Sequence, residues 1–426
     1  MNANERSITG FLMVAHWLVH TYELSIPILM TIWLREFSVT AAVLGTVVTV
    51  GYAVFGVGAL PGGILVDRYG SRRLIVGCLL GMGGAFLLVG LSQTVVTVAL
   101  ALGVWGLAAS VYHPAGLALI STGVRDDVRG RAFAYHGMAG NAGIAFGPLA
   151  TAVLLLAVDW RLVVAVLAVP ALIAAVVGLA SEFDETAAVQ VADGGRDAST
   201  SRSLASFVAD SRRVFAGGFL LVFLLVMGNG LYYRGVLTFL PELLDGFLTS
   251  QLGPVDLQSI GLTGPVAAEF DLAKYLYVGL LTVGIGGQYV GGRLSDRIRP
   301  ERGVAAMLVA LSLLALAFVP AARASLATLL AVSVGLGIAL FGMQPLVQAT
   351  IAKYSPPDAR GLSFGYTYLG IFGVGSLGAT IAGWILTYAS VGTLFVVLAG
   401  LAGSACLLAT ILGTRDGPSL AVDVDS

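Results

Sequence analysis

Three side chains that can exchange protons lie close together in the first long apolar run of the sequence, residues 10–34. They are His16, His20 and Glu23, at positions i, i+4 and i+7. In an α-helix this spacing places all three on one face. Because a charged group at the centre of a bilayer costs about 2.5–3.5 kcal/mol on insertion scales, a helix that keeps such a face must turn it toward the protein interior.

Glu23 is the one carboxylate that falls well inside an apolar run, since Glu242 falls at the end of one. A buried carboxyl group can hold a proton, and an adjacent imidazole can pass a proton on. We therefore hypothesise that Glu23 and His20 form a proton-exchange site. The alternative is a glutamate in the outer third of the helix that is hydrogen-bonded for packing alone.

The other ionisable groups inside apolar runs are His113, His136 and Arg234. A buried arginine is either an anion site or the partner of a carboxylate, here Glu23, and the sequence leaves both possibilities open. His136 is typical of a packed, hydrogen-bonded residue. His113 and His136 are too isolated in sequence for a metal site, and no phosphate-binding loop is present, so we expect no metal and no cofactor.

The composition defines the class of protein that must position these groups. Of the 426 residues, 57 % are apolar even without the 56 glycines, and 11 % are charged. Soluble domains carry about 25 % charged residues. The sequence therefore predicts an all-α, multi-pass membrane protein, and the net charge of −1 with no basic tail excludes a nucleic-acid-binding protein.

A helix needs about 20 apolar residues to cross the hydrocarbon core. Twelve such spans are predicted: 10–34, 40–66, 73–92, 94–121, 131–157, 160–180, 214–241, 273–295, 303–321, 325–350, 360–388 and 391–413. Of the 23 Lys and Arg residues, 18 fall on one side, four on the other, and Arg234 lies within a span. By the positive-inside rule, both termini are expected in the cytoplasm and the chain in the cell membrane.

Two polar segments interrupt the spans. Residues 181–213 are too hydrophilic to span and too poor in apolar residues to form a core, so we expect a cytoplasmic linker between bundles 1–180 and 214–413. Residues 245–271 form an external insert, which is either a cap over the external mouth or a loop. Residues 414–426 are expected to form a cytoplasmic tail.

The two halves repeat. Asp67-Arg68 recurs as Asp296-Arg297 at an offset of 229, and Tyr112-His113-Pro114 aligns with Met343-Gln344-Pro345 at an offset of 231. Two parallel six-helix repeats are the architecture of carriers that rock two bundles around a site at the middle of the membrane. The sequence thus predicts two pseudo-symmetric six-helix bundles.

The loop after the second span reads Gly63-Ile-Leu-Val-Asp67-Arg68-Tyr-Gly70-Ser-Arg72-Arg73. This resembles the signature of the major facilitator superfamily of secondary transporters, and Gly292 to Arg297 is a shorter second copy. The resemblance implies a conformational latch made of Gly63, Asp67, Arg68, Gly70, Arg72, Arg73, Asp296 and Arg297. A carboxylate at a helix end can bind a neighbouring helix N-terminus and pair with arginines. The alternative is that these charges only anchor the loop.

A narrower resemblance, to the fosmidomycin-resistance-type branch of exporters, rests on Ala15-His16-Trp17-Leu18-Val19-His20, Ser110 to Pro114, and Gly140-Asn141 with Gly143. In that fold the first, fourth, seventh and tenth spans line a central cavity. The resemblance therefore implies that substrate contacts His16, Tyr22, Tyr112, His113, Asn229, Tyr233, Arg234, Gln344 and Gln348, beside the proton-exchange pair.

The function that these features indicate is proton-coupled export of small organic or drug-like molecules, including anionic ones, by alternating access. The alternative is a proton- or sodium-coupled symporter that takes up an organic anion. The expected partners are a small-molecule substrate, protons and the lipid bilayer, and the protein is expected to act as a monomer. No pairing of a nucleophile with a base is visible, so an enzyme is not expected.

Overall fold

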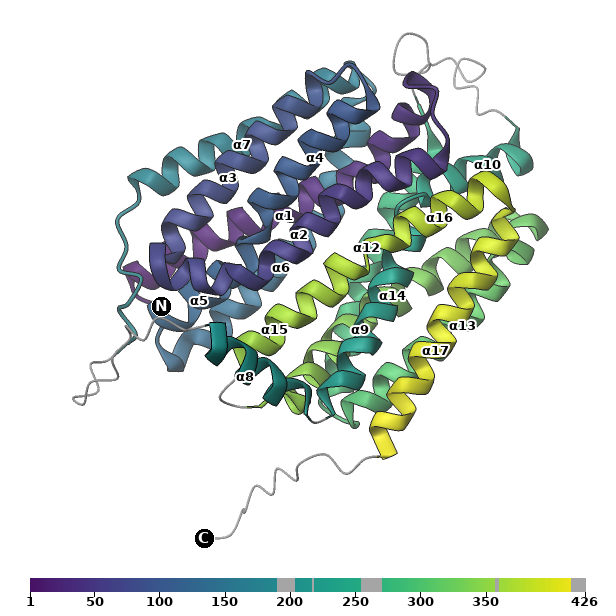
Figure 1. Cartoon of the computed structure of the whole chain (residues 1–426). Helices are drawn as coiled ribbons and strands as arrows, with labels where there is room; N and C mark the ends of the chain where they lie inside the picture. Colours follow the sequence, from purple (N-terminus) through teal and green to yellow (C-terminus); the bar gives the residue numbers. More distant parts are fainter. Residues whose placement is uncertain (190–203, 217, 254–269, 357–359, 415–426) are drawn as a thin grey trace.

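The computed structural model describes residues 1–189, 204–216, 218–253, 270–356 and 360–414, and within these ranges the side chains of Asp67, residues 204–206 and Arg360 are not described. Parts of the predicted linker, external insert and tail therefore lie outside the described residues. Within the described part the chain is helical and has no strand. Two bundles lie side by side, coloured purple to teal and green to yellow in Figure 1.

The N-terminal bundle holds the first six spans, the fourth of which is made of two helices. Its helices are α1 (Ala3–Glu36), α2 (Ala41–Tyr69), α3 (Ser71–Gly90), α4 (Val95–Ser110), α5 (Tyr112–Gly123), α6 (Asp126–Leu154) and α7 (Trp160–Ala180).

The C-terminal bundle holds the other six spans, the eleventh of which contains a π-helical segment. Its elements are α9 (Phe219–Leu237), α10 (Leu240–Leu252), α12 (Leu272–Ser295), α13 (Pro300–Ala324), α14 (Leu326–Tyr354), α15 (Arg360–Tyr368), η3 (Leu369–Val374), α16 (Leu377–Tyr388) and α17 (Val391–Thr414). The prediction of twelve spans in two six-helix bundles is confirmed.

Ten of these spans are long and apolar enough to cross a membrane by composition alone, counted over the described residues. The other two are α1 and α12, which carry the polar side chains His16, His20, Glu23 and Gln288 on inward faces. In α1 the lower hydropathy follows from the site that it builds, whereas in α12 the glycines and tyrosines also lower it.

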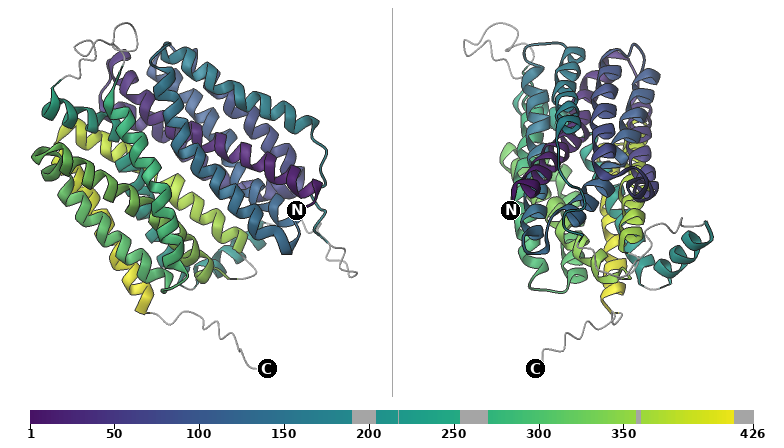
Figure 2. Two further views of the ribbon diagram at one scale, coloured as in Figure 1. Left: turned by 180° about the vertical axis from the view of Figure 1, so that it is seen from behind. Right: turned by 90° about the vertical axis from the view of Figure 1, so that its left-hand side faces the viewer.

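Segments expected to be irregular contain helices at both ends of the molecule. Helix α8 (Leu204–Phe215) covers the end of the predicted linker and the first two residues after it, and α10 extends through the start of the predicted external insert. The N-terminus, α8 and the end of α17 lie at one end of the bundles, which we call the α8 end, and α10 lies at the other, the α10 end (Figure 1, Figure 2). The sequence predicts that the α8 end is cytoplasmic.

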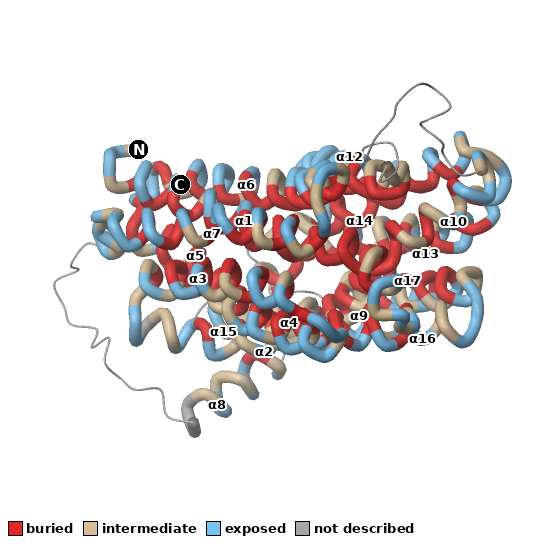
Figure 3. Tube along the Cα trace, turned by 90° about the horizontal axis from the view of Figure 1, so that it is seen from above, coloured by how far each residue is buried: buried red, intermediate tan, exposed pale blue. Residues whose placement is uncertain are grey.

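Glycines allow the helices within each bundle to touch. A Cβ atom added at Gly106 of α4 would lie 2.0 Å from the carbonyl oxygen of Gly51 in α2, and one at Gly291 of α12 would lie 1.9 Å from that of Gly342 in α14. Close backbone approach between small residues is the usual packing of membrane helices. Buried residues accordingly fill both bundles while exposed ones cover their outer faces (Figure 3).

The fourth span bends where it meets the site. Helix α4 ends at Ser110 and α5 begins at Tyr112, two residues before Pro114. Proline has no backbone N–H to donate to the preceding turn, so a helix commonly kinks at this point. Just after this bend, Tyr112 packs inside the N-terminal bundle and His113 lines the cavity between the bundles.

Candidate functional site

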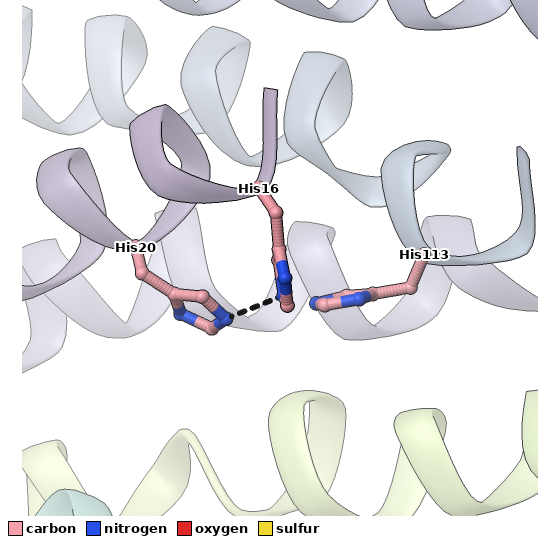
Figure 4. A group of neighbouring side chains, drawn as sticks. All are labelled: His16, His20 and His113. Carbon is pink, nitrogen blue, oxygen red and sulfur yellow. Dashed lines mark hydrogen bonds between the residues drawn. The ribbon is translucent and has the colours of Figure 1, made fainter. Parts of the chain in front are cut away.

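The polar face of α1 forms a continuous hydrogen-bonded chain. Nδ1 of His20 lies 2.7 Å from Oε2 of Glu23, and Nε2 of His20 lies 3.1 Å from Nε2 of His16. The dashed line in Figure 4 marks the second of these contacts. All three side chains lie on one face because they are three or four residues apart.

The chain ends on α6. Nδ1 of His16 donates to the backbone oxygen of His136 at 2.8 Å, and the two imidazole rings stack with centroids 3.8 Å apart. Nε2 of His136 lies 3.1 Å from the Tyr112 hydroxyl, and the ring of His113 lies edge-on to His16. The fold thus brings together all four histidines of the sequence.

This grouping corrects one expectation. Ring nitrogens of His16, His20 and His113 lie within 4.8 Å of one another, so His113 is not isolated in space. The sequence separates it from His16 by almost one hundred residues, and the helix packing that closes the distance cannot be read from spacing. Nε2 of His16 and Nε2 of His20 also share a hydrogen bond within this group.

Arg234 of α9 is the partner of Glu23. Its guanidinium Nη2 donates to Oε1 of Glu23, and both side chains are almost completely buried. The guanidinium also lies 3.7 Å from the ring centroid of Tyr52, whose hydroxyl donates to the backbone oxygen of Glu23 at 3.0 Å. Of the two possibilities left open by the sequence, the structure has the ion pair, which joins the two bundles.

A cavity of about 1110 Å³ lies between the bundles and contains most of the predicted substrate residues in its wall. These are His16 and His113 from the N-terminal bundle, and Asn229, Tyr233, Gln344 and Gln348 from the C-terminal bundle. The predicted proton-exchange pair, His20 and Glu23, also lines the cavity. The wall continues to Ser121 on α5, Phe207 and Asp210 on α8, and Gly361 on α15, so the cavity reaches the α8 end.

Three predicted substrate residues do not line this cavity. The Tyr22 hydroxyl donates to the Leu167 backbone oxygen at 2.8 Å, and the Tyr112 hydroxyl donates to that of Leu12 at 2.8 Å. Tyr22 lies two residues from His20, which is about 200° around a helix, so it must face the opposite side. Arg234 lies behind the wall, against Glu23 and Tyr52.

Other cavity residues were not predicted as site residues. Asn141 of α6 donates to Gln288 of α12 at 2.5 Å, and Gln288 donates to Gln344 at 2.8 Å. Tyr368 and Phe372 also line the cavity. These side chains lie on the fifth, eighth and eleventh spans, whereas the resemblance places the substrate residues on the first, fourth, seventh and tenth. A carboxamide inside a predicted span nevertheless needs a partner.

The bundles meet at the α10 end. Thr387 Oγ1 of α16 accepts from the backbone N–H of Ala42 at 2.9 Å, and the Thr49 hydroxyl donates to the Ser376 backbone oxygen at 3.0 Å. Arg35 of α1 lies 3.7 Å from Asp245 of α10. The cavity therefore opens at the α8 end and is closed by direct packing of α2 on α16 at the other.

The predicted latch residues lie at the α8 end. Gly70 joins α2 to α3 with φ of 78°, a conformation that favours glycine. Arg72 donates to the backbone oxygens of Gly178 and Leu179 at 2.9 and 2.6 Å, and its backbone N–H donates to Glu185 at 3.1 Å. Glu185, which was not predicted, thus binds the N-terminus of α3.

The other latch residues show fewer contacts. The guanidinium of Arg68 lies 5.2 Å from the ring of Tyr69. Gly63 lines the cavity, and Arg73, Asp296 and Arg297 are exposed. The side chain of Asp67 lies outside the described residues, so its role as a latch stays a prediction.

Comparison with known proteins identifies the family to which the chain belongs. The model of the Major Facilitator Superfamily matches residues 12–269 and 257–424. The puromycin resistance protein pur8 of Streptomyces alboniger is 38 % identical over 116 residues, 27 % of this chain and 23 % of that protein. A Na(+), Li(+), K(+)/H(+) antiporter of Planococcus maritimus is 31 % identical over 146 residues, 32 % and 34 % of the two chains. The chain thus covers about a quarter to a third of these relatives.

Solved structures share the fold over nearly the whole chain. A bacterial homologue of the human lysosomal transporter Spinster, in an inward-facing and occupied conformation, has a TM-score of 0.74 at 15 % identity and 97 % coverage of both chains. The xylose transporter XylE from E. coli, in an inward-open conformation, has a TM-score of 0.72 at 14 % identity and 98 % coverage of both. The narrower resemblance to fosmidomycin-resistance exporters stays a prediction. The chain belongs to the Major Facilitator Superfamily and is a multi-pass membrane transporter, not an enzyme.

Proposed function

We propose that the protein is a proton-coupled exporter, an antiporter of small organic or drug-like molecules that works by alternating access. Substrate enters the cavity from the α8 end, which the distribution of Lys and Arg places in the cytoplasm. The names of two relatives, a puromycin resistance protein and a cation/proton antiporter, agree with this class. The protein acts as a monomer in the cell membrane with both termini in the cytoplasm.

The observation that carries the proposal is the chain from Glu23 through His20 to His16, at the inner end of the cavity. Its three hydrogen bonds, including the one to the His136 backbone oxygen, need three protons. Two neutral imidazoles supply only two, and a carboxylate supplies none. The chain with all its hydrogen bonds therefore holds one proton more than a carboxylate with two neutral histidines, which suits a site that loads and releases a proton.

The same carboxylate couples this proton to the position of the bundles. Glu23 accepts from His20 on its own helix and from Arg234 in the other bundle. A proton that moves onto Glu23 removes the charge that attracts Arg234, and so weakens a contact between the bundles. Loss of the proton restores the pair. Proton binding can therefore bias the tilt of one bundle against the other.

The remaining parts follow from this scheme. Residues 1–180 and 214–413 move as the two bundles, 181–213 connect them, and 414–426 are the tail. Asp67 and Asp296, with their neighbouring arginines, form the latch at the cytoplasmic end. Since Arg234 is paired with Glu23, it gives no support to uptake of an organic anion.

The test uses inside-out proteoliposomes loaded with a pH-sensitive dye, with puromycin as the first substrate because a relative's name carries it. With an acidic lumen, we expect puromycin to accumulate while the lumen becomes more alkaline. The double variant Glu23→Gln/Arg234→Gln, which leaves no unpaired charge, should lose this exchange, and Glu242→Gln should keep it. Movement of substrate together with protons would show symport, and unchanged exchange in the double variant would remove Glu23 from the mechanism.

A further inference from the structure

We propose that the cavity selects uncharged, planar heteroaromatic molecules that carry neighbouring hydrogen-bond donors and acceptors, as a carboxamide does. The inference rests on the proposed function in one respect: it takes the cavity to be the transport site. It concerns which class of substrate that site accepts. Three independent features of the wall carry it.

The first feature is charge. Among the described residues of the wall, the charged side chains are Glu23 and Asp210. Glu23 is neutralised by Arg234, and Asp210 lies on α8 at the mouth, with a carboxylate oxygen 3.9 Å from Arg213. An antiporter of the proposed kind binds substrate after the chain of Glu23, His20 and His16 has released its proton. In that state an anionic substrate would be buried with no unpaired cation beside it, which costs several kcal/mol by desolvation. Charge favours a neutral ligand.

The second feature is a wall of parallel rings contributed by both bundles. The rings of His113 and Tyr368 stack with centroids 5.0 Å apart and an interplanar angle of 9°. Phe372 continues the wall, with its centroid 5.8 Å from that of Tyr368 at 13°. Nε2 of His113 is buried and has no hydrogen-bond partner among the described residues. A planar ring can stack here and offer a polar atom to that nitrogen.

The third feature is the row of carboxamides made by Asn141, Gln288 and Gln344. Donation runs in one direction along it, from Asn141 to Gln288 and from Gln288 to Gln344. This direction leaves the Asn141 carbonyl oxygen as an acceptor at one end and the Gln344 amino group as a donor at the other. Because the row crosses from α6 to α14, a ligand with both kinds of group can contact both bundles.

The experiment compares matched ligands of one ring system on the purified full-length chain in nanodiscs. Quinoline-3-carboxamide, quinoline-3-carboxylate and unsubstituted quinoline are titrated by calorimetry at pH 7.5. We expect the carboxamide to bind at least tenfold more tightly than the carboxylate and than quinoline. Equal or tighter binding of the carboxylate, or no binding of the carboxamide, would overturn the proposal.

Variants test whether the carboxamide row and the stacked rings each cause the part of the ligand preference expected of them. Gln344→Leu should reduce the carboxamide preference over quinoline about tenfold, and Tyr368→Leu should weaken all three ligands to a similar degree. The control is Gln93→Leu, in the exposed turn between α3 and α4, which should change nothing. A preference that survives Gln344→Leu would contradict the carboxamide row.

The binding result and the test of the proposed function can fail independently of each other. Binding is measured without a pH gradient and without transport. If Glu23→Gln/Arg234→Gln keeps proton exchange while the carboxamide preference is present, the coupling scheme fails and the substrate class stands. If proton exchange is lost in that variant but the wild-type cavity prefers the carboxylate, the coupling scheme stands and the proposed substrate class fails.

Discussion

Glu23 of α1 and Arg234 of α9, 211 residues apart in the sequence, form a buried ion pair between the two bundles. The other oxygen of the same carboxylate accepts from His20. One carboxylate therefore serves both the contact between bundles and the hydrogen-bonded chain that opens to the cavity. This sharing is the physical basis for coupling a proton to a change of shape.

Replacing one partner of this pair should lower the free energy of unfolding far more than replacing both. Glu23→Gln or Arg234→Gln alone leaves an uncompensated buried charge, which typically costs about 3–5 kcal/mol. The double variant leaves none, so we expect it to recover most of the loss. Unfolding in detergent, followed by tryptophan fluorescence against temperature and denaturant, measures this.

The control for that series is the exposed ion pair of Arg35 with Asp245. With Arg35 three-quarters exposed, its contribution should be below about 1 kcal/mol. An Arg35→Gln variant as unstable as Glu23→Gln would show that the loss reflects general damage and not burial of charge.

The pH dependence of stability can be tested at Glu5, which precedes the predicted first span. Its hydrogen bond with Arg125, which has an N···O distance of 2.7 Å, lowers the pKa of Glu5 to about 2 from its usual 4.5. A depressed pKa means that the native state gains stability from the carboxylate above pH 4.5 and loses it as the pH falls toward 2. The stability difference between wild type and Glu5→Gln should thus be constant above pH 5 and shrink below 4.5. A difference that does not change down to pH 2.5 would contradict this account.

Closure at the α10 end should depend on a glycine. A Cβ atom added at Gly383 of α16 would lie 2.2 Å from the Ala41 backbone oxygen in α2, so Gly383→Ala must push the bundles apart there. We expect the population of the state that is open at the α8 end to fall at least tenfold, which corresponds to a free-energy change of about 1.4 kcal/mol. The measure is the alkylation rate of a cysteine at Ser121, in a background without Cys78 and Cys406.

Gly400→Ala is the matched control, because a Cβ atom there meets nothing within 4 Å. It should leave the alkylation rate unchanged. Equal rates in Gly383→Ala and Gly400→Ala would mean that packing of α2 on α16 does not hold this end closed.

A substitution at Tyr22 tests whether its hydroxyl stabilises the helix packing, as the structure shows, and does not contact the substrate. Tyr22→Phe removes the hydroxyl that donates to the Leu167 backbone oxygen. We expect a loss of about 1 kcal/mol of stability and no change in ligand affinity. Titration of the quinoline carboxamide and thermal unfolding, on the same preparation, check both parts. Weaker ligand binding with unchanged stability would return Tyr22 to the site.

The spans and the repeat could be predicted from the sequence because both follow from local composition. The shared face of His16, His20 and Glu23 follows from helical period, and the same period places Tyr22 on the opposite side. From the sequence, the pair of Glu23 with Arg234 was one of two possibilities. The contact of His16 with His136 could not be predicted, because the approach of α6 to α1 depends on packing over the whole bundle. Gln288 was missed for another reason: it lies on α12, the eighth span, which is not one of the four spans expected to line the cavity.

The π-helical segment Leu369–Val374 has a further consequence for the eleventh span. It carries Phe372 of the ring wall, and Gly373 within it lies against the backbone of Gly56 in α2. A π turn contains about one residue more than an α turn, and one residue corresponds to about 100° of rotation. Rewinding the surplus residue into ordinary helix would swivel one part of this span about its axis relative to the other without lengthening the chain. A local change in winding beside Phe372 would therefore rotate the part of the span that packs against α2 at the closed α10 end.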